Sequence, residues 1–238
     1  AAVEPDVVVH AQACADVDRC EQQPDEAQRM NVQTTAHLCH ALQLHHRQPL
    51  VIAVSTDYVF DGTTGTPYTE EDAPRPVSVY GTTKLAAERV VLQYAKGLVV
   101  RPGTLFGPGR LNFCNAIVER CRQGQPVEAF VDQTTSPTYT DDLAAAIREL
   151  IEAVARRAWT QVPRVYHLAN DGAASRVEFA KRVVEWIGAS EALIRATRIE
   201  AQRRPAPRPP CSALTSNYVP SILGRTIRPW HDALHAYL

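Results

Sequence analysis

Three short apolar runs constrain the fold of this chain more than any other feature of its sequence. They cover residues 6–10 (D-V-V-V-H), 50–54 (L-V-I-A-V) and 98–101 (L-V-V-R). Continuous β-branched runs of this length are typical of parallel strands that are buried on both faces. Helical stretches lie between them at residues 24–44, which open with a proline and two acids, and at residues 77–89. The alternation predicts a doubly wound α/β fold, in which crossover helices cover both faces of a parallel sheet.

The second half of the chain has a mixed pattern. We expect residues 1–107 to form a partial dinucleotide-binding domain and residues 108–238 to form a smaller, mixed α/β substrate domain. Residues 136–170 are expected to return to the main sheet. The elements expected in this half are helices at 112–123, 141–157, 175–187 and 230–238, strands at 127–131 and 164–168, and an irregular proline-rich loop at 203–210. The helix at 175–187 begins with S-R-V-E, a capping box.

Composition excludes several classes of protein. A formal net charge of −1 over 238 residues gives no electrostatic reason to expect a nucleic acid or an anionic membrane as a partner. No apolar run approaches the roughly 20 residues that span a bilayer. The six cysteines form no C-x-x-C pair, so we expect reduced thiols in a cytoplasmic protein and no metal site. His45 and His46 are expected to be solvated.

The candidate active site begins with Tyr80 and Lys84, whose spacing places both side chains on one face of a helix. We expect the ammonium to lower the pKa of the phenol from its usual value of about 10 toward neutrality. Such a phenol can exchange a proton with a carbonyl oxygen while hydride reaches or leaves the carbon. Ser55 and Thr56 follow the strand at 50–54, at the sheet edge where ligands of such folds bind. Y-x-x-x-K alone also occurs in ordinary amphipathic helices, and the strand-end hydroxyls favour the catalytic interpretation.

Two motifs carry a family resemblance: S-T-D-Y-V-F-D-G at residues 55–62 and Y-G-T-T-K-L-A-A-E at residues 80–88. They resemble those of the extended short-chain dehydrogenase/reductases, and within these the dTDP-4-dehydrorhamnose reductases and the related regulatory beta subunits of methionine adenosyltransferase. The resemblance implies a catalytic triad of Thr56, Tyr80 and Lys84. It implies reduction of the 4-keto group of a nucleotide-linked deoxysugar with NADP or NAD as cofactor, and a possible homodimer.

A glycine-rich phosphate loop, which normally opens a dinucleotide-binding fold, is absent from these 238 residues. The nearest candidate is the G-T-L-F-G-P-G stretch at 103–109, which has the wrong spacing and is expected to be a loop beside the active site. P-D-V-V-V-H-A-Q-A at 5–13 resembles the fourth-strand region of the family. That alignment implies that two β-α units, about 50 to 60 residues, are missing from the front. The residue that distinguishes NADH from NADPH would lie there.

The resemblance also implies further binding residues. Those expected to contact the cofactor are Ala11, Gln12, Ala13, Asn31, Ser55, Tyr80, Lys84, Arg101 and Gly103. Those expected to contact the substrate are Asp57, Tyr58, Thr104, Asn112, Thr138 and Arg208. Some of these have plainer interpretations: Asn31 as a solvated helix residue, Arg208 as part of a basic solvated loop, and Thr138 as part of a helix cap. His10 is more simply a hydrogen-bonded histidine at a strand end than a catalytic one.

Three positions depart from the family pattern. Gln12 stands where the family has alanine, Thr104 where the reductases have tryptophan, and Cys211 where they have asparagine. These departures leave the sugar open. They also leave two alternatives: a non-catalytic NADP-binding regulatory subunit of the methionine adenosyltransferase type, and a nucleotide-sugar epimerase. Thr56 favours the reductase, because the corresponding motif of the regulatory subunits is similar to S-S-D-Y-V-F-D-G, with serine at this position.

Overall fold

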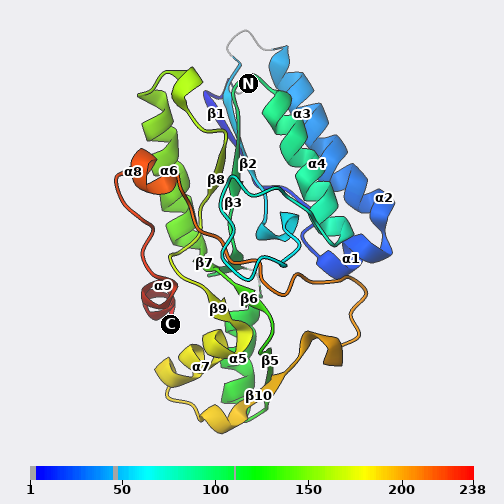
Figure 1. Ribbon diagram of the computed structural model, residues 1–238, viewed down its shortest axis with the longest axis vertical. Coiled ribbons are helices and arrows are strands. Elements are labelled where there is room, and N and C mark those ends of the chain that lie inside the picture. Colours follow the sequence, from blue (N-terminus) through cyan, green and yellow to red (C-terminus); the bar gives the residue numbers. More distant parts are fainter. Residues whose placement is uncertain (1–3, 45–47, 110) are drawn as a thin grey trace.

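The computed structural model describes residues 4–44, 48–109 and 111–238 and confirms the α/β fold. Four parallel strands form the central sheet in the order β1-β2-β3-β8 (Figure 1). They are β1 (Val7–His10), β2 (Leu50–Val54), β3 (Gly97–Arg101) and β8 (Val165–His167). Because all four strands are parallel, their carboxyl ends meet at one edge of the sheet, which in Figure 1 faces the lower half of the molecule.

Helices cover both faces of this sheet, as the continuous apolar runs predict. On one face, α3 (Thr34–Gln43) and α4 (Val79–Gln93) pack on Val51 and Ala53 of β2. On the other face, α6 (Thr140–Ala155) packs on the intervening residue, Ile52. Consecutive strand residues point to opposite faces, so a strand between two helical layers must be apolar at every position.

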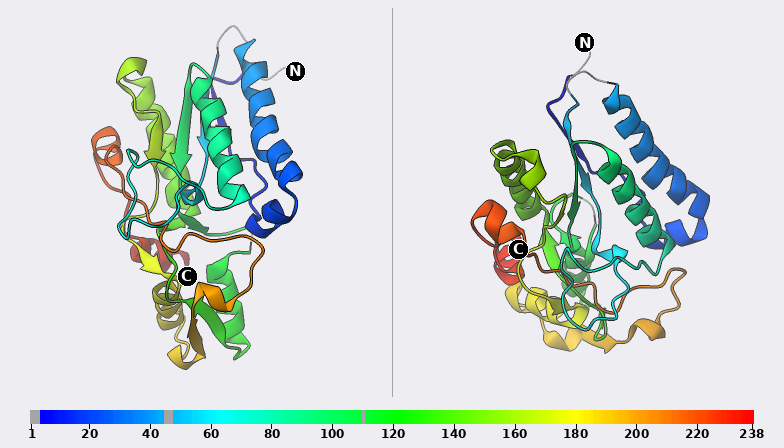
Figure 2. Two further views of the ribbon diagram at one scale, coloured as in Figure 1. Left: turned by 45° about the vertical axis from the view of Figure 1, so that its right-hand side comes forward. Right: turned by 45° about the horizontal axis from the view of Figure 1, so that its top comes forward.

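A second hydrophobic core lies beneath the carboxyl edge of the sheet (Figure 2). It is built by α5 (Phe113–Arg122), α7 (Arg176–Trp186), α9 (Trp230–Tyr237) and β5 (Val127–Phe130). β5 pairs in parallel with β10 (Ile194–Thr197), a strand that sequence patterning did not predict. The predicted capping box of α7 is present: the Ser175 hydroxyl accepts from the backbone N–H of Glu178, and the Glu178 carboxylate accepts from that of Ser175.

The segment after β1 has the polar composition of a loop, A-Q-A-C-A-D-V-D-R-C-E at residues 11–21. A short helix, α1 (Val17–Gln22), nevertheless forms there. Its N-cap, Asp16, accepts a hydrogen bond from the backbone N–H of Arg19. Cys20 is fully buried in a cluster that includes Tyr80. Tertiary burial of one small face therefore overrides the polar composition of this stretch.

The remaining elements are short. They are α2 (Pro24–Ala27), a π-helical turn (Gln28–Gln33), β4 (Thr104–Phe106), β6 (Thr134–Thr135), β7 (Pro137–Tyr139), β9 (Ala174–Ser175), α8 (Val219–Leu223), and 3₁₀ turns at Asp57–Val59, Trp159–Gln161, Glu191–Leu193 and Ile199–Ala201. Within the described ranges, no helix has the length and apolar character needed to cross a membrane.

Candidate active site

A cleft of about 220 Å³ opens where β2 and β3 end. It brings together seven of the residues expected at the site: Ser55, Thr56, Asp57, Tyr58, Tyr80, Gly103 and Thr104. Five residues that the sequence interpretation did not select also line it: Ala15, Val17, Pro102, Leu105 and Arg176. Residues from both halves of the chain therefore form one polar cleft.

Tyr80 reaches this cleft because α4 packs unusually closely on the turn after β2. Ser78 caps the helix by accepting from the backbone N–H of Gly81, at 3.2 Å. A Cβ atom at Gly81 would lie 2.2 Å from the carbonyl oxygen of Tyr58, so only glycine allows this approach. The rings of Tyr58 and Tyr80 then meet edge to face, with centroids 6.1 Å apart. The glycine after Tyr80 thus positions the phenol beside Thr56.

The phenol of Tyr80 has a pKa above its ordinary value, which corrects the expectation of a lowered one. Burial is the main cause, and the ionised carboxylate of Asp57 raises the pKa further, while a hydrogen bond with Thr56 opposes the shift. A buried phenol beside a carboxylate stays protonated at neutral pH. The group is therefore poised to donate a proton.

Lys84 lies behind the end of β2 and is buried, with 7% of its surface exposed. Its ammonium donates to the carbonyl oxygen of Val54 at 2.7 Å, and within the described part of the chain this is its one hydrogen-bond partner. Burial lowers the pKa of Lys84 to about 8, while nearby Glu88 opposes the shift. An ammonium has three N–H donors, so two remain for a ligand at the sheet edge.

Asp57 is buried in the floor of the cleft, 3% exposed. Its carboxylate accepts from the hydroxyl of Ser212 at 2.5 Å and from the hydroxyl of Thr56 at 3.1 Å. Burial raises the pKa of Asp57 to about 6, and these two hydrogen bonds and the charge of Arg176 partly offset the shift. Ser212 comes from the far end of the chain, so this contact also fixes the C-terminal segment against the cleft.

Arg101 was expected to contact the cofactor, but its guanidinium does not reach the cleft. It forms a bidentate pair with Glu88, at 2.9 Å and 2.6 Å, and both side chains are buried. Ser55 lines the cleft, yet its hydroxyl is turned to the same carboxylate at 2.5 Å. Since a buried arginine needs its counter-ion, this cluster holds α4 to the sheet.

Two other expected site residues, Asn31 and Thr138, act within the protein. Asn31 is buried, so its interpretation as a solvated residue is wrong: it accepts from the backbone N–H of Cys14 at 2.7 Å and donates to Thr83 at 3.0 Å. The Thr138 hydroxyl accepts from the backbone N–H of Gly103 at 3.2 Å. Both side chains hold loops that border the cleft.

Asn112 and His10 also have partners within the chain. Asn112 caps α5 and donates to the carbonyl oxygen of Gly107 at 2.8 Å, outside the cleft. His10 lies 3.0 Å from the hydroxyl of Thr35, in keeping with its plainer interpretation. Ala11, Gln12 and Ala13 form a largely exposed stretch directly after β1, at the carboxyl edge of the sheet.

Arg208 is neither solvated nor open to the cleft. It forms a bidentate pair with Asp18, with both N–O distances at 2.9 Å, and its side chain is 8% exposed. Asp18 also accepts from the backbone N–H of Ala206 at 3.1 Å. The pair therefore ties the proline-rich segment to α1, beneath which this segment passes in Figure 1.

The chain as a whole matches one family model. The model is described as the RmlD substrate binding domain, and the match extends over residues 1–238. The chain belongs to this RmlD family.

Relatives and solved structures agree with that assignment. The chain is 37% identical over 236 residues to a dTDP-4-dehydrorhamnose reductase of Mycobacterium tuberculosis, covering 96% of this chain and 75% of the relative. It is 32% identical to the spore coat polysaccharide biosynthesis protein SpsK of Bacillus subtilis, and the match covers 99% of this chain and 79% of that relative. A dTDP-4-dehydrorhamnose reductase of Bacillus anthracis, solved in complex with NADP, superposes with a TM-score of 0.89 at 28% identity, covering 98% of this chain and 80% of that one.

Arg176 is the functional candidate that sequence reasoning missed in this RmlD family member. It occupies the first turn of α7, next to the capping serine. Basic residues are unfavourable there, because the N-terminus of a helix carries a partial positive charge. An arginine at such a position is a signal that its side chain serves something other than helix stability.

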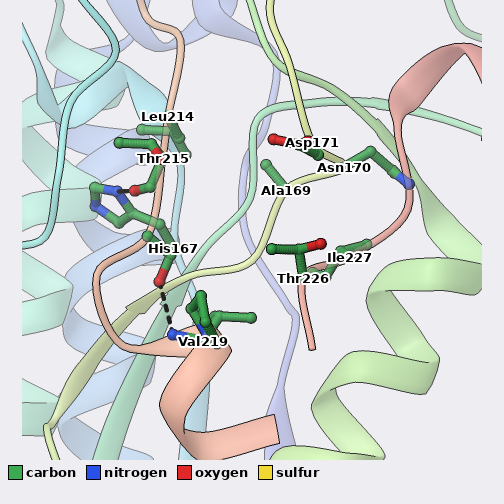
Figure 3. A pocket seen from close by; sticks show the side chains of 11 residues that line it. His167, Ala169, Asn170, Asp171, Leu214, Thr215, Val219, Thr226 and Ile227 are labelled. Carbon is green, nitrogen blue, oxygen red and sulfur yellow. Dashed lines mark hydrogen bonds between the residues drawn. The ribbon is translucent and has the colours of Figure 1, made fainter. Parts of the chain in front are cut away.

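A second cavity, of about 60 Å³, lies beyond the carboxyl end of β8 (Figure 3). His167 in its wall has Nδ1 2.9 Å from the carbonyl oxygen of Thr215 and Nε2 3.4 Å from a guanidinium nitrogen of Arg101. These partners fix a neutral ring with its proton on Nδ1, and burial lowers the pKa of His167. Asn170 likewise donates to Asp142 at 2.7 Å. The ring of His167 and the amide of Asn170 are thus engaged within the protein, and the cleft at β2 remains the candidate reaction site.

Metal ligands do not cluster in the described ranges, where no group of three or more His, Cys, Asp or Glu side chains is arranged to hold an ion. His45 and His46 lie outside the described residues.

Proposed function

We propose that this RmlD family member reduces the 4-keto group of a nucleotide-linked deoxysugar, as in dTDP-L-rhamnose biosynthesis. The observation that carries the proposal is the cleft itself, which Thr56 and Tyr80 both line while Lys84 lies behind the strand end. Similarity to named dTDP-4-dehydrorhamnose reductases across almost the entire chain supports the same reaction.

In this proposal Tyr80 is the general acid. Reduction of a ketone leaves negative charge on its oxygen, and a phenol held protonated by burial can transfer its proton there. Thr56 lines the same cleft as the phenol. Its hydroxyl donates to Asp57 at 3.1 Å in the structure, and on substrate binding it would turn to donate to the carbonyl oxygen instead.

The proposed cofactor is NADP or NAD, which supplies the hydride when bound. The residues at the sheet edge fit the nicotinamide end of such a group: Lys84 presents unused N–H donors for ribose hydroxyls, and Ala11 and Ala13 offer a stretch without bulky side chains. Solved relatives at 28% and 26% identity hold NADP and NAD, respectively.

The two alternatives are not favoured. The relatives matched over at least 96% of this chain include several named as ketoreductases or dehydrorhamnose reductases, which supports neither the regulatory subunit nor the epimerase.

All six cysteines are free thiols, which supports a reducing, cytoplasmic compartment.

The test mixes purified full-length protein with NADPH and a dTDP-4-keto-6-deoxysugar and follows the absorbance of the reduced nicotinamide. We expect steady oxidation, and we expect Tyr80→Phe to reduce kcat by about 10²- to 10⁴-fold. Tyr139→Phe is the control: it removes a phenol that lies outside the cleft and donates to Asp141 at 2.9 Å, so kcat should keep its wild-type value. Unchanged NADPH with this substrate, while a known reductase consumes it, would refute the proposal.

A further inference from the structure

Arg176 carries a charge that no carboxylate neutralises by direct contact. None of the ion pairs among residues 4–44, 48–109 and 111–238 includes it. Its guanidinium makes two long hydrogen bonds to neutral groups, at 3.3 Å to the amide oxygen of Gln133 and at 3.4 Å to the hydroxyl of Thr104. The other arginine expected to bind substrate, Arg208, is already paired with Asp18.

Arg176 lies between two cavities. The reaction cleft, with Thr56 and Tyr80, has Arg176 in its wall. A groove of about 380 Å³ lies against α5 and β5 and is lined by Phe113, Ala116, Ile117, Arg120, Val127 and Glu128. A narrow pocket between them is lined by both Arg176 and Phe113, and the guanidinium carbon stands 5.2 Å from the centre of the Phe113 ring. Arg176 therefore stands at the junction of cleft and groove.

A nucleoside diphosphate sugar has the same order of parts. Its sugar must reach the hydroxyls in the cleft, its nucleoside is large and partly apolar, and its two negative phosphates join them. We propose that Arg176 binds the diphosphate of the substrate at this junction. The inference rests on the proposed function for the identity of the ligand. A guanidinium has five N–H donors in a planar fork that matches phosphate oxygens, and only two are engaged here, both with neutral partners.

The experiment compares full-length wild-type protein with Arg176→Ala, Arg176→Lys and Arg182→Ala. Arg182 is the matched control, because it lies on the same helix and pairs with Glu185 in solvent. Equilibrium titrations measure the Kd of dTDP, thymidine and NADPH, and steady-state assays measure KM and kcat for the 4-keto sugar nucleotide. Circular dichroism of each variant checks that it is folded.

We expect Arg176→Ala to weaken dTDP binding by about 10- to 100-fold, the usual effect of losing a charge-assisted hydrogen bond. KM should rise by the same factor, while kcat and the Kd values of thymidine and NADPH stay within threefold. Arg176→Lys should lose less, because it keeps the charge without the fork. Arg182→Ala should have the same Kd, KM and kcat values as wild type.

Two results would overturn the inference. If KM rises while the Kd of dTDP is unchanged, Arg176 contacts the sugar and not the diphosphate. If neither changes, or wild type binds dTDP no better than thymidine, the residue does not bind phosphate. Because dTDP binding needs no turnover, a protein that binds dTDP through Arg176 but reduces no 4-keto sugar would refute the proposed reaction and leave this inference supported.

Discussion

Replacing Asp57 with asparagine should stabilise the folded protein at neutral pH. The pKa of this carboxyl is about 6, against an ordinary value of 3.8, because its burial outweighs its hydrogen bonds. An acid whose pKa is higher in the folded state binds more protons when folded, so its ionisation lowers stability as pH rises from about 4 to about 6. Above that window, the gap between the two pKa values corresponds to about 3 kcal/mol of lost stability. Asparagine removes this loss and can still accept from Thr56 and donate to Ser212.

The assay is urea unfolding of wild type and Asp57→Asn at pH 7.5 and pH 4.5. The gain in free energy of unfolding from the substitution should be about 3 kcal/mol at pH 7.5 and about 1 kcal/mol at pH 4.5, where the wild-type carboxyl is largely protonated in the folded state. The change of about 2 kcal/mol between the two conditions is the decisive quantity, because any fixed cost of the new amide cancels.

Asp61→Asn supplies a control of opposite sign. A hydrogen bond from the hydroxyl of Tyr68 is the main cause that holds the pKa of Asp61 below its ordinary value. Its ionised form therefore stabilises the protein, and because both pH values lie above the ordinary pKa of 3.8, asparagine should cost nearly the same at pH 7.5 and at pH 4.5. A pH-independent effect of Asp57→Asn, or a greater loss of stability at pH 7.5 than at pH 4.5, would show that burial does not hold this carboxyl toward its neutral form.

Three further substitutions test the framework around the cleft. Glu88→Ala leaves the guanidinium of Arg101 buried without its counter-ion, so the free energy of unfolding in urea should fall by about 3–5 kcal/mol. Adding Arg101→Met should restore most of this loss, and a double variant whose loss is the sum of the two single losses would contradict the explanation. Gly81→Ala would place Cβ 2.2 Å from a backbone carbonyl oxygen, so we expect a loss of about 1–3 kcal/mol and a lower kcat, and unchanged values of both would disprove the close approach. Asp18→Ala should cost about 1–2 kcal/mol, since the pair with Arg208 is partly exposed, and should speed proteolytic cleavage at 203–210. Cleavage at the wild-type rate would show that the pair does not hold this segment.

The cleft illustrates how motif and environment contribute separately to a site. The spacing of Tyr80 and Lys84 brought both side chains to one helix, as predicted, but their environments set the pKa values. Burial and a neighbouring carboxylate raise the pKa of the phenol, while the ammonium is turned to the carbonyl oxygen of Val54. Residue types and their spacing indicate which groups meet, whereas desolvation depends on the atoms that surround them.

The same distinction separates the arginines. Arg101 and Arg208 follow family motifs, and the folded chain pairs them internally with Glu88 and Asp18. Arg176 belongs to a stretch that reads as a helix cap, and it is the one that lines the cleft. Sequence position alone could not rank the three, because the partner that neutralises a charge lies far away along the chain: Asp18 and Arg208 are 190 positions apart.

The amino-acid sequence by itself determined the parallel sheet, its two helical layers and the strand-end location of the candidate site. These follow from local patterns: continuous apolar runs, helix caps and the four-residue spacing of two side chains. Tertiary structure alone decided the short helix after β1, the pairing of β5 with β10, and which arginines are paired internally and which one lines the cleft. Those outcomes depend on contacts between distant segments, whose energies are set by burial and charge and not by propensity.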